Sequence, residues 1–69
     1  MTMLVTINGV QRHLSDGATV ASVLESLHRS DGRGVAVAVD DRVVPRSAWA
    51  STELSDGARV EVLVAVQGG

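Results

Sequence analysis

The chemistry that this sequence offers lies in its last residues, where Gly68 and Gly69 leave the terminal α-carboxylate on a residue without a side chain. Glycine has no Cβ, so a terminus of this kind can approach another surface closely and enter a narrow channel. With Gln67 before the glycines, residues 66–69 span at most about 13–14 Å when extended. Such a segment can reach into an active site while the folded part stays outside. A frayed end or a linker is the alternative interpretation.

A terminal carboxylate needs activation before it can react. It is ionised at neutral pH and is then a poor acylating group, so a partner would first convert it, for example into an acyl adenylate. A sulfur nucleophile could then displace AMP and leave a thiocarboxylate. The sequence contains no cysteine, which excludes thiolate catalysis, disulfides and thiolate-bound zinc. We therefore expect a carrier whose reactive group is built on its backbone terminus.

Other residues with chemical potential lack the spacing that a site requires. His13 and His28 have no metal-ligand spacing and no suitable third ligand, so no metal site is expected. The serines fall in predicted turns and on solvated faces, and so small a domain has no spare volume for the pocket of a nucleophilic triad. The run from Gly32 to Gly34 lacks the Lys-Ser/Thr ending of a phosphate loop. No catalytic residue is predicted.

Composition predicts one small globular domain. The 69 residues are 45% hydrophobic but include one Trp and no Phe or Tyr, so the core must be aliphatic. A net charge of −2 argues against a nucleic-acid module. No run is long enough to span a membrane and no signal segment opens the chain, so we expect a cytoplasmic protein that is monomeric alone. Arg46 and Arg59 form either salt bridges or partner contacts, which the sequence leaves open.

The first elements follow from the hydrophobic period. Alternation predicts strands over residues 3–7 and 10–14, joined by an Asn8-Gly9 turn in which both residues take positive φ. A helical stripe then begins, and its members are Val20, Val23, Leu24 and Leu27. Thr19 is the expected N-cap, although Ser22 stands where a full capping box would have Glu or Gln. The helix is expected to end near Arg29.

The second half of the chain predicts three more strands. They are expected at residues 35–39, at residues 42–44 before Pro45, and from Val60 to Val66, with one helical turn around residues 47–50. Trp49 in that turn is expected to cover the edge of the core. Residues 14–20 and 54–60 are nearly identical, but a helical pattern follows the first copy and alternation follows the second. We interpret them as one turn used twice and not as a structural repeat.

This order of elements predicts an α+β domain with the β-grasp (ubiquitin-like) fold. We expect a mixed sheet of about five strands, one helix packed on one face, and an extended C-terminal tail, with the domain at residues 1–65 and the Gly-Gly tail at 66–69. One helix covers only one sheet face, so the other is left to water or to a partner. Leu4, Leu63 and Ala65 lie opposite the buried rows and form the predicted partner surface; ordinary exposed apolar area is the alternative.

Four stretches indicate a family. They are Val35 to Val39, Val43-Val-Pro-Arg-Ser-Ala-Trp49, Leu54-Ser-Asp-Gly-Ala-Arg-Val-Glu61 and the terminal Ala65-Val-Gln-Gly-Gly69. In them the chain resembles the ThiS family, the sulfur carriers of thiamine biosynthesis, over essentially its whole length. The missing aromatic in the first strand and the absence of lysine are departures from the family pattern, and neither touches the tail.

The resemblance implies a reaction sequence carried out by partners. An E1-like, ATP-dependent enzyme of the ThiF type would adenylate Gly69, and a sulfur donor such as a cysteine desulfurase relay would convert it into a thiocarboxylate. A thiazole synthase of the ThiG type would receive the sulfur, and the chain would bind no cofactor itself. A sulfur carrier of another pathway, like the small subunit of molybdopterin synthase, and a non-catalytic β-grasp binding module are the alternatives.

Overall fold

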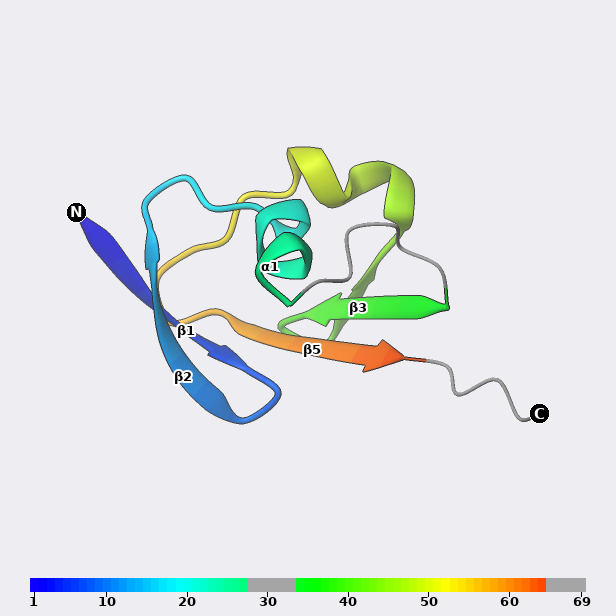
Figure 1. The fold of residues 1–69 in the computed structure, drawn as a ribbon, viewed down its shortest axis with the longest axis horizontal. Coiled ribbons are helices and arrows are strands. Elements are labelled where there is room, and N and C mark those ends of the chain that lie inside the picture. Colours follow the sequence, from blue (N-terminus) through cyan, green and yellow to red (C-terminus); the bar gives the residue numbers. More distant parts are fainter. Residues whose placement is uncertain (28–33, 65–69) are drawn as a thin grey trace.

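The computed structural model describes residues 1–27 and 34–64, which form one mixed sheet with helices on one side (Figure 1). In chain order the elements are β1 (Thr2–Ile7), β2 (Val10–Ser15), α1 (Val20–Ser26), β3 (Val35–Val39), β4 (Arg42–Val44), the 3-10 helix η1 (Arg46–Ser51) and β5 (Arg59–Val64). The strand order in the sheet is β2-β1-β5-β3-β4. The central strands β1 and β5 run parallel and the other neighbours are antiparallel. This confirms the predicted β-grasp fold.

Two tight turns set the geometry of the outer strand pairs. Asn8 and Gly9 have φ values of 49° and 82° between β1 and β2, as predicted. Asp40 and Asp41 have φ values of 49° and 69° between β3 and β4. Two consecutive positive φ values are typical of the two-residue turns that match the twist of a hairpin. The Asp-Asp turn reaches this geometry without a glycine, in a region that costs most L-residues free energy.

A complete capping box starts α1. The Thr19 hydroxyl accepts a hydrogen bond from the Ser22 N–H at 3.2 Å, and the Ser22 hydroxyl oxygen accepts one from the Thr19 N–H at 2.9 Å. Thr19 is therefore the N-cap, as predicted. The expectation that Ser22 leaves the box incomplete is wrong, because its short hydroxyl reaches back to the cap as a Glu or Gln side chain would.

The helix is shorter than the sequence suggests. It ends at Ser26, although the hydrophobic period predicts an end near Arg29. The Leu27 N–H is shared between the carbonyl oxygens of Val23 and Leu24, each at 3.2 Å, and this sharing tightens the last turn. Arg29 lies outside the described residues. No helix in the described part of the chain is both long and apolar enough to cross a membrane.

The core lies between α1, η1 and the sheet. Its buried side chains are Met3, Val5, Ile7, Val20, Val23, Leu24, Val37, Trp49, Leu54, Ala58, Val60 and Val62. Alternate residues of β1 and β5 supply five of these twelve side chains, because successive side chains of a strand point to opposite faces. The opposite face of the sheet, called the open face below, has no helix over it in the described structure.

The repeated Leu-Ser-Asp-Gly-Ala segments adopt the same turn twice, as predicted. Gly17 and Gly57 both have φ of 87°. The Ala18 N–H donates to the Ser15 carbonyl at 3.1 Å, and the Ala58 N–H donates to the Ser55 carbonyl at 3.0 Å. A positive φ at the third position is typical of type II turns. The first copy leads into α1 and the second into β5, so the following residues decide the element.

Candidate functional site

The structure describes the strand that leads to the predicted reactive terminus. The predicted site residues Gln67, Gly68 and Gly69 lie outside the described residues, as does Ala65. The last described element is β5, which ends at Val64 on the side of the molecule opposite the N-terminus (Figure 1). The contacts that hold β5 in the sheet therefore determine where the terminal segment, residues 65–69, begins.

The two neighbours of β5 hold different lengths of it. On one side β1 pairs with its beginning, where Thr6 lies opposite Arg59 and Ile7 lies opposite Val60. On the other side β3 pairs with β5 from Val60 to its end, where Val35 lies opposite Val64. The second half of β5 therefore extends past the end of β1 while β3 still supports it.

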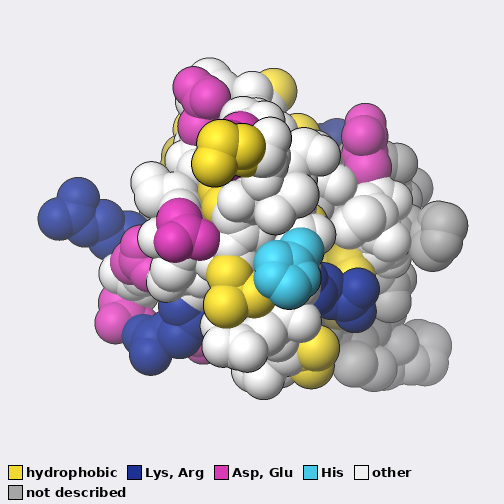
Figure 2. All heavy atoms as spheres, turned by 90° about the vertical axis from the view of Figure 1, so that its left-hand side faces the viewer, with side chains coloured by type: hydrophobic (Ala, Val, Ile, Leu, Met, Phe, Trp, Pro, Cys, Tyr) yellow, Lys and Arg dark blue, Asp and Glu magenta, His cyan; other side chains and the backbone are white. Residues whose placement is uncertain are grey.

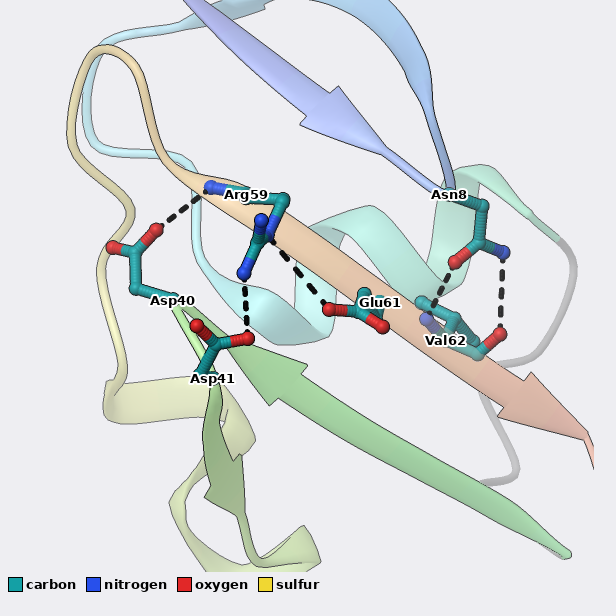
Figure 3. Close-up of polar contacts among 6 residues, drawn as sticks. All are labelled: Asn8, Asp40, Asp41, Arg59, Glu61 and Val62. Carbon is teal, nitrogen blue, oxygen red and sulfur yellow. Dashed lines mark hydrogen bonds and ion pairs between the residues drawn. The ribbon is translucent and has the colours of Figure 1, made fainter.

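The side chain of Asn8 forms hydrogen bonds with the part of β5 that extends past the end of β1. Its Oδ1 accepts a hydrogen bond from the Val62 N–H at 2.8 Å, and its Nδ2 donates to the Val62 carbonyl at 3.2 Å (Figure 3). The Asn8 backbone N–H donates to the Val60 carbonyl at 2.9 Å. One residue in the β1–β2 turn thus contacts two successive positions on the same edge of β5.

A charged group fixes the beginning of β5 to the β3–β4 turn. The Arg59 guanidinium forms ion pairs with Asp41 and, at 3.8 Å, with Glu61 (Figure 3). Asp40 Oδ1 accepts from the Arg59 N–H at 3.0 Å, and the Asp40 N–H donates to the Arg59 carbonyl at 2.8 Å. The structure thus places Arg59 in salt bridges. Arg46 begins η1 and is exposed.

The open face has an apolar patch near the end of β5. Leu63 and Val43 are 69% and 79% exposed. Leu63 lies opposite Ala36 in the sheet, and Val43 lies opposite Ala38. These four residues, called the open-face patch below, border a depression of about 100 Å³ together with Val37 and Glu61.

Leu4, the other described member of the predicted partner surface, lies at the far end of the same face. The Leu4 carbonyl accepts a hydrogen bond from Gly57, and the register places Leu4 beside that residue. Leu63 lies six residues beyond Gly57 in the sequence, roughly 20 Å away at the usual rise of a strand. The structure thus brings Leu63 together with Val43 and not with Leu4. Alternation assigns each residue to a face, but it gives no sign that β4 lies beside β3 at this point.

A second and larger depression, of about 380 Å³, lies between the turn at residues 15–18 and α1, and its lining contains no histidine. Within residues 1–27 and 34–64, no group of three His, Cys, Asp or Glu side chains is placed to hold a metal ion. His13 is exposed in β2, and His28 lies outside the described residues. Figure 2 shows the end of the molecule opposite the end of β5, where hydrophobic side chains form small separate groups among charged and polar ones.

Comparisons with known proteins agree with this architecture. The model of the ThiS family matches residues 5–69. A crystal structure of a thiamine biosynthesis protein (ThiS) from Geobacter metallireducens has a TM-score of 0.80 and 29% identity, covering 97% of this chain and 100% of that one. A solution structure of a thiamine biosynthesis protein from the same organism has a TM-score of 0.79 and 29% identity, covering 97% of this chain and 88% of that one.

A curated relative is much longer than the chain. A thiazole synthase from Paramagnetospirillum magneticum is 36% identical over 67 residues, which are 97% of this chain and 20% of that protein. The chain therefore spans about one fifth of the length of the curated relative that it matches. Because the family model matches nearly the whole sequence and the solved ThiS structure has the same fold, the chain belongs to the ThiS family.

Proposed function

We propose that this chain is a sulfur carrier in thiamine biosynthesis, a cosubstrate of partner enzymes and not itself an enzyme. The main support is the match to the ThiS family, which continues through the end of β5 to Gly68 and Gly69. Relatives described as a thiamine biosynthesis protein and as a thiazole synthase support the pathway. The absence of cysteine from the sequence supports a reactive group on the backbone.

The proposed reaction uses the carboxylate of Gly69. One carboxylate oxygen attacks the α-phosphorus of ATP bound to an E1-like partner, which releases pyrophosphate and gives an acyl adenylate. The outer sulfur of a persulfide, on a donor such as a cysteine desulfurase relay, then adds at the acyl carbon and displaces AMP. A thiol attacks the donor-side sulfur of the resulting acyl disulfide, which releases a thiocarboxylate on Gly69 and forms a disulfide between that thiol and the donor. The resulting thiocarboxylate gives its sulfur to a thiazole synthase, and one relative that contains a matching segment has that name.

The open-face patch is the proposed contact for the activating partner. Leu63 belongs to the strand that leads to Gly69, and its side chain and that of Val43 are largely exposed. Residues 65–69 span at most about 17 Å beyond Val64, so a partner on this patch would have its reactive centre within that reach. An exposed apolar group beside such a segment gives a partner both a docking surface and a defined distance to the carboxylate.

The test is the mass of the intact chain after incubation with the activating enzyme, ATP and a sulfur source. We expect a gain equal to the replacement of one oxygen by one sulfur, located in the C-terminal peptide. Deletion of Gly69 is the matched control and should abolish the gain. A wild-type chain that keeps its mass while the enzyme modifies its own known carrier would refute the proposal.

A second assay distinguishes the pathway. The thiocarboxylate form is supplied in separate reactions to a thiazole synthase and to the large subunit of a molybdopterin synthase. Thiazole formation supports the proposal. Sulfur transfer in the second reaction alone would assign the chain to a different pathway while keeping the carrier chemistry.

A further inference from the structure

We infer that Asn8 is a positioning residue for the terminal segment: its side-chain amide replaces the missing continuation of β1 and fixes the direction in which β5 leads to Gly69. This inference rests on the proposed function, because it concerns delivery of the same carboxylate. It assigns a role in delivering the carboxylate to a turn residue that is remote in sequence from Gly69.

The geometry at Val62 reproduces a rung of the sheet. The last β1–β5 pair is Ile7 with Val60, and the next position on that edge of β5 is Val62. If β1 continued in the same parallel register, one of its residues would present a C=O to the Val62 N–H, and the residue two positions further on would present an N–H to the Val62 carbonyl. The primary amide of Asn8 presents the same two groups, with Oδ1 2.8 Å from the Val62 nitrogen and Nδ2 3.2 Å from its oxygen. The side-chain amide of Asn8 thus supplies the two hydrogen bonds that the backbone of a longer β1 would form with Val62.

The turn and the contact together require this residue type. Asn8 has φ of 49°, a conformation that Asn, Asp and Gly tolerate best. Glycine would serve the turn but has no side chain to reach Val62. Aspartate would accept from the Val62 N–H, but its ionised carboxylate could not donate to the Val62 carbonyl. Only asparagine among the three meets both requirements.

The contact lies just before the end of β5. The backbone groups of Val60 and Val62 face the β1 side, and successive residues of a strand alternate in this respect, so those of Val64 face the same side. Asn8 is thus the final described contact to the β5 backbone from the β1 side, two residues before Val64. Without its amide, β3 would be the remaining sheet neighbour of Val62, and the end of β5 would sample more directions.

The structure offers a matched control at the other end of the same strand pair. Asp56 Oδ1 accepts a hydrogen bond from the Leu4 N–H at 2.7 Å. This contact also joins a side chain in a turn to the backbone of a central strand, but it lies at the end remote from Val64. A general loss of stability would follow from removing either contact. An effect on the terminal segment would follow only from removing the Asn8 amide.

The experiment compares Asn8→Gly, Asn8→Asp and Asp56→Ala in the full chain. The glycine variant keeps a residue suited to the turn and removes the amide. Hydrogen exchange and ¹⁵N relaxation of the Val62 and Val64 amides report the end of β5. Adenylation kinetics at varied carrier concentration, followed by pyrophosphate release, report delivery to the partner.

For Asn8→Gly we expect exchange at Val62 to accelerate by about tenfold and the KM for the carrier to rise by about fivefold, with kcat within twofold, as the loss of one or two hydrogen bonds would produce. Asn8→Asp should lie between this variant and the wild type. Asp56→Ala should accelerate exchange at Leu4 and leave the KM unchanged.

Two results would overturn the inference. One is wild-type protection of Val62 in Asn8→Gly; the other is an equal rise in KM for Asn8→Gly and Asp56→Ala. If the wild-type chain is not adenylated at all, the proposed function fails and the delivery role fails with it. Exchange at Val62 would then still show whether the amide holds the end of β5.

Discussion

The indole N–H of Trp49 donates a hydrogen bond to the carbonyl oxygen of Val44 at 2.9 Å, which ties η1 back to β4 across Pro45. Trp49 is only 7% exposed and belongs to the core. A buried indole normally satisfies its N–H in this way. The only aromatic side chain of the sequence therefore both fills the core and fixes the chain after β4.

Trp49→Phe should lower the free energy of unfolding by about 1–2 kcal/mol, because a ring remains but the Val44 carbonyl loses its donor. Trp49→Ala should cost about 3–5 kcal/mol, because it also leaves a cavity. A domain of this size has little reserve, so the alanine variant should be largely unfolded. Urea denaturation followed by circular dichroism measures both changes. A phenylalanine variant as stable as the wild type would show that the hydrogen bond contributes nothing.

Asp41→Gly should stabilise the β3–β4 turn. A positive φ costs most L-residues about 1–2 kcal/mol and Asp less than that, whereas an exposed ion pair such as Asp41 with Arg59 contributes about 0.2–1 kcal/mol. The expected net gain in the free energy of unfolding is roughly 0.5 kcal/mol, and it should increase in high salt, which screens the ion pair.

Asp40→Gly is the matched variant for this turn. It relieves the same backbone conformation but also removes the acceptor for the Arg59 N–H. We expect a smaller gain than for Asp41→Gly, or a loss. Thermal unfolding of both variants at low and high salt checks the pair. If Asp40→Gly were more stable than Asp41→Gly, the hydrogen bond from the Arg59 N–H to Asp40 would not contribute more than the ion pair of Asp41 with Arg59.

Leu63→Ser and Val43→Ser should weaken binding to the activating enzyme by about tenfold or more, because central apolar contacts dominate most protein interfaces. Both side chains are largely exposed, so the thermal midpoint should change little. Leu4→Ser tests the surface predicted from the sequence, since Leu4 lies at the far end of the same face. Isothermal titration measures all three affinities. Equal losses for Leu4→Ser and Leu63→Ser would contradict a contact centred on the open-face patch.

Gly68→Val should abolish adenylation while leaving the thermal midpoint of the domain unchanged. A branched side chain next to Gly69 would block entry into a narrow channel, and a terminal residue contributes little to folding. Pyrophosphate release and differential scanning calorimetry measure the two effects. Gln67→Ala is the control, because a smaller side chain at the preceding position should still pass. Normal adenylation of Gly68→Val would refute the threading of the terminus.

Several features of the fold follow from neighbouring residues alone. The Asn8-Gly9 turn and the two Ser-Asp-Gly-Ala turns are predicted from residues within four positions of each other. The structure confirms the positive φ values of Asn8 and Gly9 and the use of one turn twice. Alternation likewise predicts the buried row of β1 and the burial of Val60 and Val62 in β5, whereas Val64, the next valine of that row, is exposed. The helix end was the local feature predicted least well, because the shared Leu27 N–H has no sequence signal.

The contacts between distant residues could not be predicted in this way. Asn8 and Val62 are 54 residues apart, and the sequence shows only that Asn8 suits a turn. Leu63 and Val43 share a surface because β5 and β4 flank β3, which strand order and register determine. The sequence by itself determined the turns and the hydrophobic periods of the strands and the helix, since these depend on local backbone preferences and on the alternation of side chains. Only the tertiary structure decided which side chains border the end of β5, because sheet neighbours are chosen by the packing of the whole core.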